Sequence, residues 1–222
     1  MSRLSYPGAG EPRPAALPPR ERTVGQLVAE SIRIYGDNFS RAIAIGVPPA
    51  VLSVVTQHTS RRLGFVLGPT LYGALLSASF VAACVLVLDV RVVRRRLLEA
   101  WLLGWLVFIP VTFLVLLYVL PALVWLAAVG LSVPALLVEE RSLRNAVARG
   151  WQLARADFVH ALGGLATLAI VVFLTQIVLV FTLRGAGGAA VDTALSLANI
   201  VISPLLYLGT ALLYVDQAAR VE

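Results

Sequence analysis

The sequence predicts an all-α polytopic integral membrane protein, with about six transmembrane helices and amphipathic helices at the membrane interface. Of its 222 residues, 59% are hydrophobic and 14% are charged, whereas soluble domains are about half apolar and a quarter charged. The apolar residues also collect in long segments, most of them near the ~20 helical residues that cross a bilayer core. Composition and segment length therefore give the same fold class.

The chain divides into a short tail and one membrane domain. Residues 1–22 contain five prolines and no apolar stretch, which is typical of a disordered Pro/Arg-rich tail and not of a cleavable signal peptide. The membrane domain is expected over residues 23–222. It opens with an amphipathic interfacial helix at 23–39, where Thr23 and Gln26 match a capping box.

Six apolar segments are expected to span the membrane. They lie at 42–57, 65–88, 101–119, 121–138, 160–182 and 193–214. The first is short for a hydrocarbon core of about 30 Å. The third and fourth form one continuous apolar run, which we expect to break at Pro121, because a single helix over 101–138 would be about 57 Å long.

Arginine placement predicts the orientation, since the chain contains no lysine. With six crossings and a cytoplasmic N-terminus, fifteen of the 18 arginines face the cytoplasm, and only Arg61, Arg62 and Arg184 lie outside. This asymmetry is what the positive-inside rule requires. We therefore expect a multi-pass protein of the cytoplasmic (inner or plasma) membrane with both termini inside. The net charge of +6 favours anionic lipid headgroups as partners over nucleic acid.

The sequence offers little chemistry. His58 and His160 are predicted at opposite membrane faces, too far apart to share a metal ion, and no hydrolase, nucleotide-binding or paired-cysteine motif is present. We therefore expect no catalytic residue, metal or cofactor, and no enzyme. All twelve acids are expected in the tail, in loops or at helix ends, which disfavours ion-coupled transport.

Two polar residues are predicted inside the membrane at similar depth on neighbouring helices. Gln176 and Asn199 could hydrogen-bond to each other, and a structural pair is favoured over substrate binding. Prolines interrupt several predicted spans and could line a cavity. They occur at positions 48, 49, 110, 134 and 204.

Glu139 and Glu140 end the fourth span, where we interpret them as a solvated boundary pair, with a functional role as the alternative. A helix over 142–158 follows. Its arginines share one face and small apolar residues fill the other, with a tryptophan at the border between them. Four residues of this helix are candidates for binding lipid or a partner: Arg144, Arg149, Trp151 and Arg155. Topology alone would also explain the arginines.

Three stretches together resemble one family. They are "RTVGQLVAESIRIYGDNF", "VPALLVEERSLRNAVARGWQLARADF" and "TALLYVDQAARVE". They are similar to the glycerophosphoryl diester phosphodiesterase membrane-domain family and its uncharacterised bacterial relatives, over residues 23–222. The chain departs from the family at Gly150, where serine is usual, at Ala156, where glycine is usual, and at Ala218, where a second arginine is common.

The resemblance implies a multi-helix membrane domain that is sometimes joined to a soluble phosphodiesterase. It does not extend to that soluble barrel or its metal site, so we carry over no phosphodiesterase activity. The expected function is a non-enzymatic membrane protein that organises lipid or docks a partner. The alternative is a carrier or permease that binds a small or lipidic solute among proline-kinked helices.

Overall fold

The computed structural model describes residues 18–58 and 61–221, and every regular element in this part of the chain is a helix. The elements are a 3-10 turn η1 (Pro19–Glu21), α1 (Val24–Asp37), α2 (Phe39–His58), α3 (Arg61–Leu88), α4 (Arg94–Leu117), α5 (Val119–Val129), α6 (Ser132–Val138), α7 (Leu143–Ala156), α8 (Phe158–Leu183) and α9 (Gly188–Val221). The predicted all-α class is confirmed.

Within the described residues, five stretches are long and apolar enough to cross a bilayer, which makes this a multi-pass membrane protein. They are residues 69–88 of α3, residues 94–115 of α4, residues 119–138 across α5 and α6, and the whole of α8 and α9. α1 and the first part of α2 add a sixth if counted together, although the chain bends by 105° between them. The predicted first span therefore passes only as half of a bent pair.

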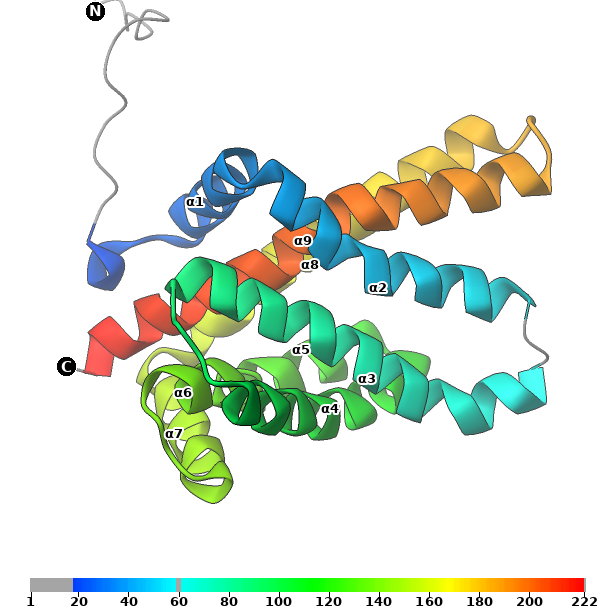
Figure 1. Cartoon of the computed structure of the whole chain (residues 1–222). Helices are drawn as coiled ribbons and strands as arrows, with labels where there is room; N and C mark the ends of the chain where they lie inside the picture. The colour runs from blue at the N-terminus through cyan, green and yellow to red at the C-terminus, as the bar shows by residue number, and fades with distance from the viewer. Residues whose placement is uncertain (1–17, 59–60, 222) are drawn as a thin grey trace, which may run out of the picture.

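The long helices run back and forth along one bundle (Figure 1). α3 packs on α4, and α9 contacts both α2 and α8. η1 and the C-terminal end of α9 lie at the same end of the bundle, together with α7 and the connection between α3 and α4 (Figure 1). The turn between α8 and α9 lies at the opposite end, as do the end of α2 and the start of α3 (Figure 1). We call the end that holds η1 and α7 the arginine-rich end, and the end that holds the turn between α8 and α9 the far end.

The predicted break at Pro121 is wrong by three residues. α4 ends at Leu117, and Tyr118 adopts extended backbone angles. A proline ring clashes with the carbonyl four residues earlier and cannot bond to it, so Pro121 ends the helix at Leu117 and itself fits the first turn of α5. Pro134 acts in the same way on Gly130, which separates α5 from α6. The fourth predicted span is therefore two helices.

Side-chain hydrogen bonds to backbone carbonyls connect the inner helices. Ser77 donates to the carbonyl of Trp101 at 2.6 Å, and the Trp101 indole donates to the carbonyl of Ala74 at 2.9 Å. Trp125 links α5 to α4 through the carbonyl of Val107 at 2.9 Å. Such bonds join helices where water is absent and the hydrophobic effect cannot.

Pro48, Pro49, Pro110 and Pro204 lie inside uninterrupted helices. Pro204 leaves the carbonyl of Ile200 without its usual helical donor. α2 crosses α9 at this carbonyl, and a side chain at Gly46 would overlap it. The proline and the glycine together therefore fix a close contact between two helices that are far apart in the sequence.

The N-terminal prediction is confirmed in one part and corrected in another. Thr23 and Gln26 form the predicted capping box, with bonds of 2.8 and 3.4 Å. The helix that follows ends at Asp37, and Phe39 belongs to α2. Residues 18–22 are not a loose tail, because η1 packs on α9 and Arg22 is buried. The predicted disorder of residues 1–17 lies outside the described residues.

Candidate functional site

α7 is an amphipathic helix with one face buried against the bundle. Ala146, Gly150, Leu153 and Ala154 form the buried side, and the helix packs on α5, α6 and α9. A side chain at Gly150 would overlap the hydroxyl and backbone nitrogen of Ser132 in α6. The close approach of these two helices thus explains why glycine occupies a position where the resembled family tends to have serine.

Two of the predicted arginines lie on the exposed face of α7. Arg144 and Arg155 are exposed, and neither forms an ion pair within residues 18–58 and 61–221. The guanidinium of Arg155 lies 4.9 Å from the ring centroid of Trp151, in a cation–π contact. Trp151 is 45% exposed, so its ring is available at the surface that carries these charges.

Arg149 has a different environment from the other two. Its Nε donates to Glu139 at 2.9 Å, and only 15% of its side chain is exposed. Glu139 also accepts a hydrogen bond from Arg141 at 2.5 Å and from the Tyr214 hydroxyl at 3.1 Å. Arg149 therefore ties α7 to the end of α6 and to α9, and it is not available as part of an exposed binding face.

Glu139 and Glu140 do not act as a carboxylate pair. Burial works to raise the pKa of Glu139, but hydrogen bonds from Arg149 and Arg141 and the charge of Arg149 outweigh it, so the pKa lies below its usual value. Glu140 is exposed and has a left-handed backbone at φ 48°. Its carbonyl accepts a hydrogen bond from Arg96 at 2.9 Å. Glu139 is thus an ion-pair anchor rather than the solvated boundary residue that was predicted.

A cleft between the start of α4 and the start of α7 adds two arginines that the sequence analysis did not select. It has a volume of about 640 Å³, and Arg95, Arg96 and Arg144 line it with Glu99 as the acidic residue. Arg95 and Arg96 contact Glu99 at 3.0 and 3.2 Å. Three arginines against one glutamate leave a cationic cleft beside the exposed face of α7. The run of arginines at 94–96 was the signal for it.

The predicted polar pair is present between α8 and α9. Gln176 Nε2 donates to Asn199 Oδ1 at 2.8 Å. Both residues are half-buried, and they lie in the part of the hairpin that is surrounded by exposed apolar side chains.

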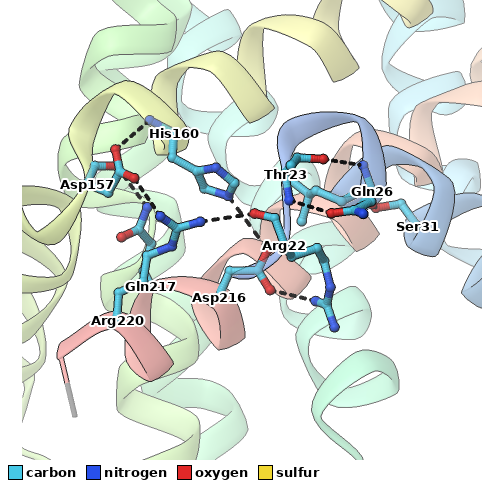
Figure 2. Close-up of polar contacts among 10 residues, drawn as sticks. Arg22, Thr23, Gln26, Ser31, Asp157, His160, Asp216, Gln217 and Arg220 are labelled. Atoms are coloured by element: carbon cyan, nitrogen blue, oxygen red, sulfur yellow. Dashed lines mark hydrogen bonds and ion pairs between the residues drawn. The ribbon is translucent and has the colours of Figure 1, made fainter. Parts of the chain in front are cut away.

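A second polar cluster joins the start of α1, the start of α8 and the end of α9 (Figure 2). Arg22 forms an ion pair with Asp216 at 2.5 Å, and the Asp216 side chain is fully buried. His160 Nε2 lies 3.7 Å from the other carboxylate oxygen of Asp216, which is longer than a hydrogen bond. Asp216 was predicted just beyond the last span, at 193–214, but α9 continues past it to Val221.

Asp157 and Arg220 complete the cluster (Figure 2). Asp157 caps α8 by accepting from the backbone N–H of His160 at 2.9 Å, and it pairs with Arg220 at 2.6 Å. Arg220 also donates to the carbonyl of Arg22 at 3.0 Å, and Gln217 donates to the carbonyl of Asp157 at 2.9 Å. His160 is buried in the first turn of α8. The cluster joins three segments, and the first and last of them are 198 residues apart in the sequence.

No described group of three or more histidine, cysteine or acidic side chains could hold a metal ion. No family model matches the chain, and neither a curated protein nor a solved structure matches it. The resemblance to the glycerophosphoryl diester phosphodiesterase membrane-domain family thus stays a prediction.

Proposed function

We propose that this chain is a non-enzymatic membrane protein, related to the membrane domain that it resembles, which binds anionic lipid headgroups at the cytoplasmic face of the cell membrane. The observation that carries the proposal is the exposed face of α7. Arg144 and Arg155 have no ion-pair partner among the described residues, while the opposite face of the same helix is buried. Each arginine near an anionic surface contributes about 1 kcal/mol.

The surroundings of α7 support lipid over a protein partner. The cationic cleft beside it provides Arg95 and Arg96, and Trp151 lies at the same surface, where tryptophan is enriched in membrane proteins. The arginine-bearing connections also gather at the bundle end that holds the C-terminal part of α9 (Figure 1). This arrangement favours placing that end in the cytoplasm.

The headgroup test compares one double variant with two single variants. Arg144→Gln/Arg155→Gln should lower the anionic lipid that co-purifies with the folded protein and make the remainder more sensitive to salt. Arg149→Gln should instead reduce stability and change lipid retention little, because Arg149 is held by Glu139. Arg184→Gln at the far end is the matched control. Unchanged anionic lipid in the folded double variant would leave the exposed arginines a topological or protein-docking role.

Orientation is tested with an impermeant thiol reagent on a Cys84→Ala background. Cys84 and Ala146 are fully buried, so the exposed Ala148 is a better reporter for α7 than Ala146. We expect Ala186→Cys to react in intact cells and Ala148→Cys to react only after permeabilisation. The reverse pattern would invert the protein in the membrane.

A carrier for a lipidic solute is the alternative function. Four of the five prolines that suggested broken helices lie inside continuous α2, α4 and α9, which weakens that argument. Pro134 is the exception, because it separates α5 from α6. A lateral groove among α2, α3 and α4 favours the alternative. Flux across sealed vesicles of the reconstituted protein would separate a carrier from a static lipid-binding protein.

A further inference from the structure

A groove with a volume of about 920 Å³ lies between α2, α3 and α4, apart from α7. One end of the groove is polar and contains Asn38, Arg41 and Asp89. The rest of its wall is apolar. The groove thus has the two-part chemistry of an amphiphile, charged at one end and hydrocarbon along its length.

The apolar wall is a continuous stripe of α3. It consists of Ala78, Val81, Ala82, Val85 and Leu86, whose spacing places them on one helical face. The alanines leave the hollow, because larger side chains at these positions would fill it.

The length of the groove matches one leaflet. From Ala78 to Asp89 the chain rises about 16 Å at 1.5 Å per helical residue. Half of a hydrocarbon core of about 30 Å is about 15 Å. A single acyl chain that lies along this stripe would therefore reach from the middle of the bilayer to the charged rim.

The charges at the rim select a class of headgroup. Within the described part of the chain, neither Arg41 nor Asp89 forms a salt bridge, although both line the same groove. A guanidinium attracts phosphate, whereas a carboxylate repels an anionic headgroup and attracts an ammonium group. The pair is complementary to a zwitterion that carries phosphate and amine.

The backbone at Asp89 does not require a carboxylate, although aspartate tolerates its left-handed conformation better than most residues. Asp89 follows the last residue of α3 with φ at 46°, a conformation that glycine adopts at helix ends without steric cost. Glycine at position 89 would form this turn equally well. The turn therefore does not depend on the charge of Asp89, and that charge lines the groove.

We propose that this groove holds one acyl chain of an amine-bearing phospholipid from the leaflet at the arginine-rich end, with its phosphate at Arg41 and its ammonium group at Asp89. The site is separate from the exposed face of α7. Failure of the anionic-lipid experiment on Arg144 and Arg155 would leave it standing, and the converse also holds.

The test uses the full chain reconstituted in vesicles of phosphatidylethanolamine and phosphatidylglycerol in equal parts, then extracted in mild detergent. Retained lipid is identified by mass spectrometry. Phosphatidylethanolamine should be enriched over its share of the vesicle. Arg41→Gln should lower total retained lipid about fivefold, and Asp89→Asn should abolish the preference for phosphatidylethanolamine while lipid is still retained.

Substitutions that fill the groove with a larger side chain provide an independent test. Ala82→Phe should expel the lipid, whereas Val178→Phe on the lipid-facing surface of α8 should retain it. If Ala82→Phe fails to fold, Ala44→Phe plugs the groove from α2. Full retention in a folded plugged variant, retained lipid in the bulk proportions, or an unchanged preference in Asp89→Asn would each overturn the proposal. So would a dimer without lipid, because a second copy would then fill the groove.

Discussion

The two ends of the α8–α9 hairpin are held by different forces. At the arginine-rich end, Asp216 and Asp157 accept from Arg22 and Arg220, and the cluster attaches the hairpin to the start of α1. At the far end, α8 exposes a row of large apolar side chains, and the side chain of Gln176 is hydrogen-bonded to Asn199 of α9. Buried polar contacts therefore hold the hairpin in position at the arginine-rich end, whereas contact of its apolar side chains with lipid hydrocarbon stabilises it at the far end.

The first prediction removes the centre of the polar end. Asp216→Asn should lower the free energy of unfolding by about 3–5 kcal/mol, because the buried guanidinium of Arg22 loses the carboxylate that compensates its charge. Denaturant unfolding in detergent micelles measures the change. Asp192→Asn, at an exposed position near the other end of α9, should change the stability by less than about 0.5 kcal/mol.

A double-mutant cycle tests whether the loss of stability in Asp216→Asn comes from the ion pair with Arg22. Arg22→Gln combined with Asp216→Asn should cost less than the sum of the two single changes. Additive costs would mean that Asp216 stabilises the end of α9 through other contacts.

The second prediction tests close packing near the polar end. Gly150→Ser should destabilise the protein by about 1–3 kcal/mol, because the new side chain overlaps Ser132. Thermal unfolding in detergent measures it. Gly25→Ser is the control, since open space surrounds that position. An unchanged melting temperature for Gly150→Ser would show that α6 and α7 can separate without cost.

The third prediction concerns the far end. Gln176→Leu or Asn199→Leu should each cost about 0.6–2 kcal/mol, and the double change should cost less than the sum, because the second change removes no further hydrogen bond. Unfolding of the three variants in detergent provides the cycle. If the two costs are strictly additive, the Gln176–Asn199 hydrogen bond does not stabilise the far end, which then depends on lipid contact.

The smallest expected effect is a dependence on pH at Glu139. Because the pKa of Glu139 is lowered in the folded protein, its contribution is fully present above the unfolded value of about 4.3 and is lost as pH falls through the folded pKa. The stability difference between wild type and Glu139→Gln should therefore shrink on acidification from neutral pH. If the stability difference between wild type and Glu139→Gln stays constant as the pH falls well below about 4.3, the ion-pair role of Glu139 is contradicted.

The sequence by itself determined the fold class and the identity of several local contacts. Apolar segments near the length of a bilayer require helices, since a lipid-exposed backbone must satisfy its own hydrogen bonds. Thr23 and Gln26 predicted their capping box because both partners lie within one turn. Gln176 and Asn199 were paired because a short turn fixes the depth of both residues in a hairpin.

The tertiary structure alone decided which charges are paired and which are exposed. Arg149 and Arg155 both belong to the polar face of α7, near its two edges, and their partners differ: Arg149 meets Glu139, whereas Arg155 stacks on Trp151. Arg22 and Asp216 are separated by 194 residues, and no local pattern predicts a contact at that separation. Helical periodicity specifies the face on which a side chain lies, whereas its partner depends on how distant helices pack against that face.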